Sequence, residues 1–263
     1  MKILKPKTGH SGDTFRELLD IWQERGYCEV EYTDSQFCWI EKQGEILLYD
    51  FPRLDDRPIE PFKYGLFGNT VPNHEQCSSW IFWARSPKLL EKHRQQLPEE
   101  RDIETIFLGK VENDIQLNNR KDKWEDVIEV FSMPISLGDV TNTNYPYTPD
   151  QYLDMVKRSK YGLCLSGYGP KCNREIEYMG LGTVPIVTPN VDMTYYDSPI
   201  EGEHYIRVES PDKLNETIFS ISKEKWRQMS NNCLQWYERN ASPKGSFDIT
   251  IRIIENEFNY RSV

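Results

Sequence analysis

Apolar positions in the first thirty residues predict a strand, a loop, a helix and a second strand. The helix, expected over residues 14–26, repeats its apolar side chains at the three- and four-residue spacing of one helical face, and Gly26 follows as a stop signal. Strands are expected at 2–7 and 28–33, on either side of it. The apolar face consists of Phe15, Leu18, Leu19 and Trp22. This order is half of a Rossmann-like unit.

Short apolar runs continue through the rest of the first hundred residues. They predict four strands and then a helix over residues 86–97. The predicted strands are 37–42, 45–51, 63–69 and 79–84. Proline and a run of charged residues at 97–102 interrupt the apolar pattern, so we expect a linker there and a first α/β domain over residues 1–100.

A second series of strands and helices follows this linker. The alternation has the spacing that is typical of parallel sheets, and we expect a parallel sheet in each half of the chain. The predicted strands are 103–111, 127–134, 161–166, 183–189 and 204–208, and the predicted helices are 149–159, one from Asn173, 210–222, 222–240 and 246–260. We assign residues 101–245 to a second domain and 246–263 to a C-terminal helix that crosses back to the first.

Composition narrows the choice of partners. The 263 residues carry a formal net charge of −10, which argues against sequence-independent binding to nucleic acid. No window approaches the roughly 18 apolar residues of a membrane span, and the first apolar run is too short for a signal peptide. We therefore expect a cytoplasmic protein, with an excised lumenal domain as the alternative. The six cysteines form no C-x-x-C pair and no metal-like cluster with the four histidines, which predicts free thiols and no metal.

The segment 161–187 is the strongest candidate for a ligand site. It predicts a strand, a glycine-rich loop, a helix and a strand, and a right-handed crossover places this loop at the carboxyl edge of the sheet, where ligands bind. Gly167 and Gly169 let backbone N–H groups approach a ligand, and the helix that begins near Asn173 directs its unpaired N–H groups to the same point. These features predict a local phosphate site in an acidic protein.

Two charged residues share a face in the first turn of this helix. Arg174 is placed to pair with an anion, and Glu177, three positions later, to accept hydrogen bonds from two hydroxyl groups. The spacing leaves a second interpretation equally open, in which the two side chains pair with each other on a solvated face. The loop has neither the G-x-G-x-x-G of dinucleotide-binding folds nor the G-K-[ST] of a P-loop.

This segment resembles the donor-binding half of the exostosin-like glycosyltransferases, glycosyltransferase family 47. The family pattern is S-[KR]-[FY]-x-L-C-x-x-G followed by R-x-x-E-A-x-x-x-G-C-x-P-V, and it covers residues 159–187 well and 103–245 loosely. The matching residues are Ser159, Lys160, Tyr161, Leu163, Cys164, Gly167, Arg174, Glu177, Gly182, Pro185 and Ile186. The resemblance implies an α/β protein with a GT-B-like fold, in which two Rossmann-like domains face each other across a cleft.

The resemblance also implies roles for individual residues. It makes Glu177 the residue that holds the ribose hydroxyls, and it places Arg174 and the loop N–H groups against the diphosphate. Arg120 resembles the arginine that such folds place near the leaving phosphate, with a solvated basic turn as the alternative interpretation. The implied donor-binding set is Arg120, Ser166, Gly167, Tyr168, Gly169, Lys171, Asn173, Arg174 and Glu177.

Three positions depart from the family pattern. Tyr178 stands where the family usually has Ala, Thr183 where it has Cys, and Asn173 near its usual small serine. We interpret Tyr178, which follows the ribose-binding glutamate, as a residue that narrows the donor site. On this interpretation the donor preference departs from that of the family at Tyr178 and Thr183.

Inverting transfer requires a base that takes the proton of the acceptor hydroxyl. Retaining GT-B enzymes carry a glutamate eight positions before the ribose-binding one, and Gly169 stands there, which favours inversion, as is usual in the resembled family. We expect the catalytic base to be His10 or Asp13 in the loop after the first strand, with an exposed loop histidine and helix-cap support as the respective alternatives. Further candidates are Asp50, Asp55 and Glu75.

The sequence therefore predicts a metal-independent inverting glycosyltransferase that transfers a sugar from a UDP- or GDP-sugar to a hydroxyl of a glycan or glycoside. Two other functions stay open. A nucleotide-sugar epimerase of similar fold would convert the donor without any acceptor. A non-catalytic module that binds carbohydrate or nucleotide sugars would be indifferent to replacement of His10 and Asp13.

Overall fold

The computed structural model describes residues 1–7, 15–42, 45–49, 61–69, 72, 75–109, 118, 120, 124, 130–132, 147–167 and 169–259. Five residues that the sequence singles out lie outside these ranges: His10, Asp13, Asp50, Asp55 and Tyr168. The chain divides into two compact units. The first comprises Met1–Lys88, Met193–Ser198 and Glu238–Val263, and the second comprises Leu89–Asp192 and Pro199–Tyr237.

The first unit contains a six-stranded sheet of order β2-β1-β3-β4-β5-β6. The strands are β1 (Lys2–Pro6), β2 (Glu29–Thr33), β3 (Cys38–Ile40), β4 (Ile46–Tyr49), β5 (Tyr64–Phe67) and β6 (Cys77–Ser79). β3 runs antiparallel to both of its neighbours, and the other pairs are parallel. The prediction of a parallel sheet is therefore wrong for this half. The connection from β3 to β4 is far shorter than the dozen or so residues that a parallel crossover needs.

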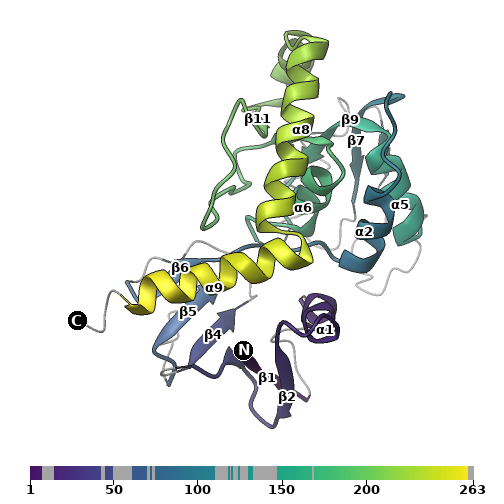
Figure 1. Ribbon diagram of the computed structural model, residues 1–263. Coiled ribbons are helices and arrows are strands. Elements are labelled where there is room, and N and C mark those ends of the chain that lie inside the picture. The colour runs from purple at the N-terminus through teal and green to yellow at the C-terminus, as the bar shows by residue number, and fades with distance from the viewer. Residues whose placement is uncertain are drawn as a thin grey trace. The chain divides into compact units, whose positions relative to one another are not determined.

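Two helices complete the first unit: α1 (Arg16–Glu24) and α9 (Pro243–Asn259), which is yellow in Figure 1. Buried indole groups tie α9 to segments far away in the sequence. Trp22 Nε1 of α1 donates to the Pro243 carbonyl at 2.8 Å, and Trp80 Nε1, just after β6, donates to Thr250 Oγ1 at 2.8 Å. Because each indole N–H has a partner, both tryptophan rings can be fully buried.

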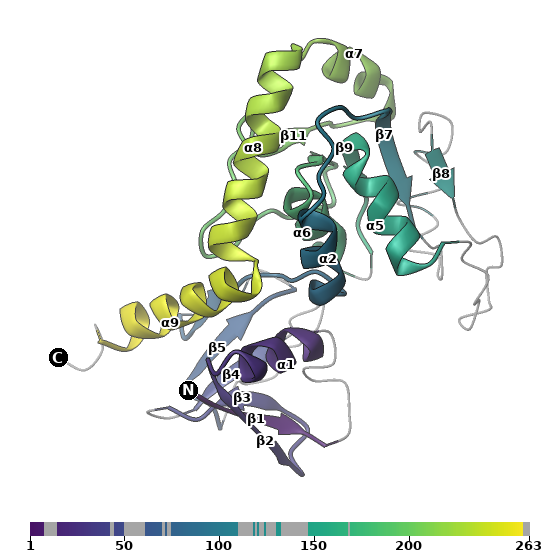
Figure 2. The same cartoon turned by 45° about the vertical axis from the view of Figure 1, so that its right-hand side comes forward.

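The second unit contains a five-stranded sheet of order β11-β10-β9-β7-β8, and every strand pair in it is parallel, as the sequence predicts (Figure 2). The strands are β7 (Ile103–Leu108), β8 (Val130–Ser132), β9 (Ser159–Cys164), β10 (Val184–Val187) and β11 (Ile206–Arg207). The helices that lie wholly or mostly in the second unit are α2 (Pro87–Arg94), α5 (Pro149–Lys157), α6 (Asn173–Gly180), α7 (Leu214–Phe219) and α8 (Lys223–Asn240). A short 3-10 turn at Pro211–Lys213 precedes α7. The second unit is a doubly wound α/β sheet.

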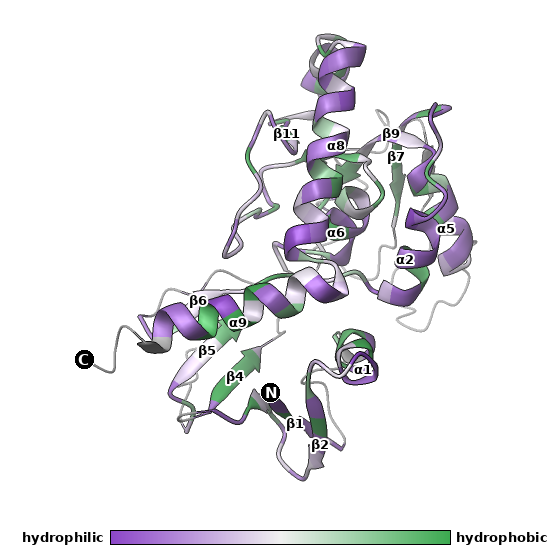
Figure 3. Cartoon of the chain, in the orientation of Figure 1, coloured by the Kyte–Doolittle hydropathy of each residue, from purple (hydrophilic) through white to green (hydrophobic). Residues whose placement is uncertain are grey.

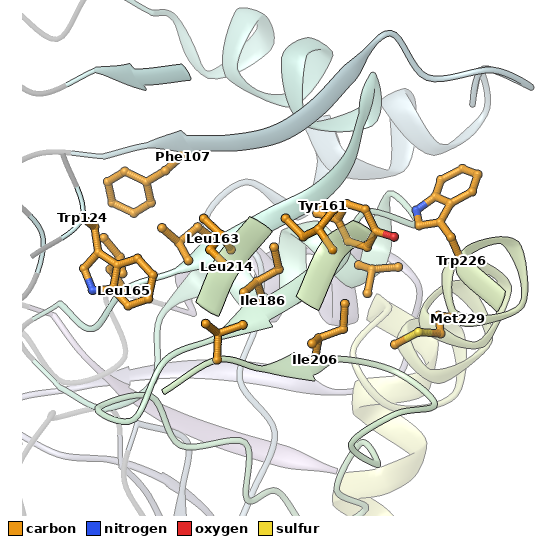
Figure 4. Packing of buried hydrophobic residues seen from close by; sticks show 13 residues of the cluster. Phe107, Trp124, Tyr161, Leu163, Leu165, Ile186, Ile206, Leu214, Trp226 and Met229 are labelled. Atoms are coloured by element: carbon orange, nitrogen blue, oxygen red, sulfur yellow. The ribbon is translucent and has the colours of Figure 1, made fainter. Parts of the chain in front are cut away.

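The two faces of β9 are covered differently. Tyr161 and Leu163 point into a hydrophobic cluster that Leu214 of α7 and Trp226 and Met229 of α8 complete (Figure 4). The central strand β7 is strongly apolar over much of its length and is coloured green in Figure 3. On the opposite face, the alternate residue Gly162 packs against the helix α6 that follows β9. This packing fixes α6 against the strand from which the candidate site extends.

One residue of the predicted linker at 97–102 is buried in the second unit. Arg101 is buried and donates to the Ser159 carbonyl at 2.8 Å and to the Leu181 carbonyl at 2.7 Å. The first segment of the first unit ends at Lys88, and residues 97–102 belong to the second unit. The charge run is polar in composition, but one of its charges binds backbone carbonyls inside the fold, which composition does not reveal.

Candidate functional site

The second sheet has its topological switch point between β7 and β9. From β7 the chain passes outward to β8, whereas from β9 it passes in the opposite direction to β10. Because these strands are parallel, the loops at the carboxyl ends of β7 and β9 diverge from the same edge of the sheet. Open α/β sheets bind ligands at this point. The loop after β9 is the glycine-rich segment.

Arg120 lies against the glycine-rich loop. Its side chain is only 5% exposed, and its Nε donates to the Ser166 carbonyl at 3.1 Å. The interpretation of Arg120 as part of a solvated basic turn is therefore wrong. A β-carbon at Gly167 would stand 3.2 Å from Arg120 Nη2 and 3.2 Å from Cys172 Sγ, so the guanidinium approaches the loop closely, and a larger residue here would make these side chains shift slightly. The loop turns tightly, with the Gly167 N–H donating to the Gly169 carbonyl at 3.3 Å.

Arg174, at the second position of α6, reaches the end of the neighbouring strand. Its guanidinium carbon lies 4.4 Å from the centroid of the Phe107 ring, and Nη2 donates to the Leu108 carbonyl at 3.2 Å. Its Nε and Nη1 are shielded from solvent and have no hydrogen-bond partner among the described residues. Buried N–H groups without hydrogen-bond partners destabilise the folded protein. This favours the binding of a ligand whose acceptor atoms pair with them.

Glu177, one turn along α6, is 6% exposed and accepts a hydrogen bond from the Tyr152 hydroxyl at 2.9 Å. Tyr152 belongs to α5. Burial, together with the charge of Glu177, raises the pKa of Tyr152 well above its usual value, so the phenol stays protonated and remains a donor. The nitrogens of Arg174 do not pair with Glu177. The interpretation in which these two residues form an ion pair on a solvated face is therefore wrong.

Glu175 is fully buried at the third position of α6. Its Oε2 accepts from the backbone N–H of Cys172 at 2.7 Å, and its Oε1 has no partner among the described residues. Burial raises the pKa of Glu175 to about 7, although the positive charge of Arg174 acts to lower it. The same contact sets the start of the helix, because it satisfies an N–H group just before the first turn.

The remaining predicted donor-binding residues also lie at this edge. Lys171 is 2% exposed, and burial lowers its pKa to about 8, with the charge of Asp192 acting to raise it. Ser166 is buried in the loop, and Asn173 is the half-buried first residue of α6. The fold therefore brings all the described members of the set to one sheet edge, and only Tyr168 lies outside the described residues.

Tyr178 and Thr183 have packing roles around α6. Tyr178 is fully buried, and its ring occupies the space beside Gly162, where a β-carbon would approach to 2.3 Å. Thr183 Oγ1 donates to the Val156 carbonyl at 2.7 Å and accepts from Arg101 at 3.0 Å. Thr183 therefore has a structural role. The Tyr178 hydroxyl donates to the Leu163 carbonyl at 3.4 Å and lies within electrostatic reach of Arg174 and Tyr152, so its effect on donor preference stays a prediction. Both lie in the packing between α6, the sheet and the end of α5.

The glycine and proline of the family-like pattern also have structural roles. Gly182 has a φ of 70° just after α6, the left-handed conformation that ends a helix, and Pro185 lies within β10. The predicted catalytic bases His10 and Asp13 lie outside the described residues, as do Asp50 and Asp55, while Glu75 is exposed in the first unit. The catalytic base stays a prediction.

Sequence reasoning missed two residues of the site. Nothing local marks Tyr152, because its contact with Glu177 joins separate helices. Glu175 was visible beside Arg174 but received no role, although its three-residue spacing from Cys172 is that of a helix-start contact.

The site thus combines two guanidinium groups, a lysine that titrates near pH 8 and a carboxylate held by a tyrosine hydroxyl, which suits an anion attached to a hydroxyl-bearing group. Among the described residues, no cluster of three His, Cys, Asp or Glu side chains could hold a metal ion, and no helix is long and apolar enough to cross a membrane. All six cysteines are free, as predicted. No protein-family model matches the chain, and no curated protein matches it significantly.

Proposed function

We propose that the chain is an inverting glycosyltransferase that uses a UDP- or GDP-sugar as donor and a hydroxyl of a glycan or glycoside as acceptor. The observation that carries the proposal is the pair Arg174 and Glu177 at the switch point of a parallel sheet. The first has shielded nitrogens without partners among the described residues, and the second is a nearly buried carboxylate on the same helix. The GT-B arrangement and the family are proposals that rest on the sequence resemblance.

Arg174 suits a diphosphate for electrostatic reasons. Its Nε–H and Nη1–H groups diverge, so separate oxygens of a diphosphate would satisfy them through charge-assisted hydrogen bonds. The first backbone N–H groups of α6 and the helix dipole add positive potential at the same end. Arg120, held beside Gly167, supplies a second cation without the need for a metal ion.

Glu177 suits a ribose because a carboxylate accepts hydrogen bonds from two adjacent hydroxyl groups. It stands three residues after Arg174, so the two side chains leave α6 on neighbouring rows one above the other. A nucleoside diphosphate carries its phosphates next to its ribose diol, just as Arg174 stands next to Glu177 on this helix. The pairing therefore favours a nucleotide over a simple anion such as free phosphate.

In the proposed reaction, the acceptor oxygen forms a bond to the anomeric carbon as the bond from that carbon to the diphosphate oxygen breaks. The electron pair of the broken bond leaves with the diphosphate, and the acceptor proton passes to the base, for which His10 and Asp13 are the candidates. Arg174 and Arg120 stabilise the charge that develops on the leaving group.

The test is a panel of UDP- and GDP-sugars measured by thermal shift, followed by donor hydrolysis and transfer assays. We expect at least one nucleotide sugar to raise the melting temperature of the wild type. Glu177→Ala should abolish that shift, whereas Glu209→Ala, at an exposed position of the same unit, should retain it. If no nucleotide sugar binds, the proposal is wrong. Donor conversion without acceptor would replace it with an epimerase, and binding without turnover would replace it with a binding module.

A further inference from the structure

The first turn of α5 is held firmly in place. The Gln151 N–H donates to Thr148 Oγ1 at 3.2 Å, and the Thr148 N–H donates to Gln151 Oε1 at 2.9 Å, which is a reciprocal capping box. In the same turn, Asp150 contacts the buried His93 of α2, with 3.1 Å between Asp150 Oδ1 and His93 Nε2. The helix therefore presents its next residue, Tyr152, from a fixed position.

Tyr152 uses that position to contact Glu177 on another helix. Its hydroxyl donates to Glu177 Oε2 at 2.9 Å. The positive charge of Arg174 acts on the same phenol and opposes the rise in its pKa. The contact therefore involves Glu177, the residue proposed to hold the ribose, and lies within electrostatic reach of Arg174, the residue proposed to hold the diphosphate. No local sequence pattern requires a tyrosine here, since the apolar face of α5 is formed by Leu153 and Val156.

We infer that Tyr152 is a positioning residue that fixes the orientation of the Glu177 carboxylate, so that the site selects ribonucleotides over 2′-deoxyribonucleotides. The inference rests on the proposed function, because it takes Glu177 as the group that binds the ribose hydroxyls. Tyr152 itself need not touch the ligand.

The physical reason is the freedom of a glutamate carboxylate. The last torsion of Glu is broad, so an unrestrained carboxylate rotates and presents its lone pairs to a diol only part of the time. A hydrogen bond from a rigid phenol to one oxygen removes that rotation and places the acceptors in advance. A site built to accept from a hydroxyl then discriminates strongly against an analogue that lacks it, because the acceptor is left without a partner.

The experiment compares the affinity of four probes, UDP, 2′-deoxy-UDP, GDP and 2′-deoxy-GDP, by isothermal titration calorimetry. We expect the wild type to bind one ribonucleotide at least about tenfold more tightly than its deoxy counterpart. Tyr152→Phe should weaken ribonucleotide binding and leave deoxynucleotide binding nearly unchanged, which lowers the ratio severalfold. The matched control is Tyr161→Phe, which removes a hydroxyl from the hydrophobic cluster on the other side of β9 (Figure 4). It should keep the wild-type ratio.

A second measurement distinguishes loss of the Glu177 orientation from a general loss of structure in Tyr152→Phe. In a Glu177→Gln background, the ratio of ribonucleotide to deoxynucleotide affinity should no longer respond to Tyr152→Phe, because the oriented carboxylate is absent. The inference is overturned if Tyr152→Phe weakens both members of a pair equally, and the proposed function then survives. It is also overturned if the wild type binds both members equally, and the proposed ribose-binding role of Glu177 then fails with it. If the wild type binds none of the four probes, the proposed function fails and the inference fails with it.

Discussion

Glu175 gives the sharpest prediction about stability. It is fully buried, and burial raises its pKa from 4.5 to about 7 in the folded protein. The folded state therefore favours the protonated carboxyl. The group costs no stability below its unfolded pKa near 4.5, and the cost grows as the pH rises to about 7 and is constant above that. A glutamine at this position cannot ionise, and its amide oxygen still accepts from the Cys172 N–H.

The magnitude follows from the size of the pKa change. One unit corresponds to ~1.4 kcal/mol, so a rise from 4.5 to about 7 corresponds to about 3 kcal/mol at pH 8. Because Glu175 is shielded from solvent, this value needs no reduction for screening by water. We expect Glu175→Gln to be close to wild type in stability at pH 4.5 and more stable by about 3 kcal/mol at pH 8.

The assay is urea denaturation followed by circular dichroism at several values between pH 4.5 and 8. The quantity to plot is the difference in the free energy of unfolding between Glu175→Gln and the wild type. Glu209→Gln, at an exposed position, should show a difference that does not change with pH. A difference for Glu175→Gln that is equally flat would refute the link between this carboxyl and folding, and with it the tight, solvent-free packing at the start of α6.

Four further predictions test separate parts of the account. Gly162→Ala should destabilise the protein by about 3 kcal/mol in chemical denaturation, because its β-carbon would stand 2.3 Å from the Tyr178 ring, and Tyr178→Leu should restore part of that loss. Thr183→Val should cost about 1–3 kcal/mol, since Arg101 and the Val156 carbonyl lose a partner, yet leave the nucleotide dissociation constant unchanged; a changed constant would return this residue to the ligand site. Gly167→Ala should weaken nucleotide binding modestly in calorimetry with little change in melting temperature, because its β-carbon would shift the Arg120 guanidinium by a few tenths of an ångström, and equal binding would show that this approach is unimportant. Nucleotide-diphosphate affinity should fall as the pH rises through about 8, where Lys171 loses its proton, whereas Lys171→Arg, which stays charged, should show no such fall.

Local patterns predicted the second sheet and the sheet edge at which the candidate residues lie. The apolar runs of β7, β9 and β10 are buried in parallel strands, and parallel strands with short loops bring the glycine-rich segment to a defined edge. In the first unit, the direction of β3 was missed, because the direction of a strand depends on the length of its connection, whereas its apolar pattern does not.

The direction of individual side chains explains the remaining differences. Tyr178 follows Glu177 directly, but successive residues of a helix lie about 100° apart, so one faces β9 while the other meets α5. From spacing alone, an ion pair between Arg174 and Glu177 was as well supported as separate roles in binding a ligand. The structure separates them, because Arg174 finds the Leu108 carbonyl and Glu177 finds Tyr152, both distant in the sequence.

The central claim is that the switch point of the second sheet binds a nucleoside diphosphate through Arg174 and Glu177. The most direct measurement is a crystal structure of the protein with UDP or GDP. The account predicts the diphosphate against Arg174 and the first turn of α6, with the ribose hydroxyls hydrogen-bonded to Glu177. A nucleotide bound elsewhere, or with its ribose directed away from Glu177, would contradict it.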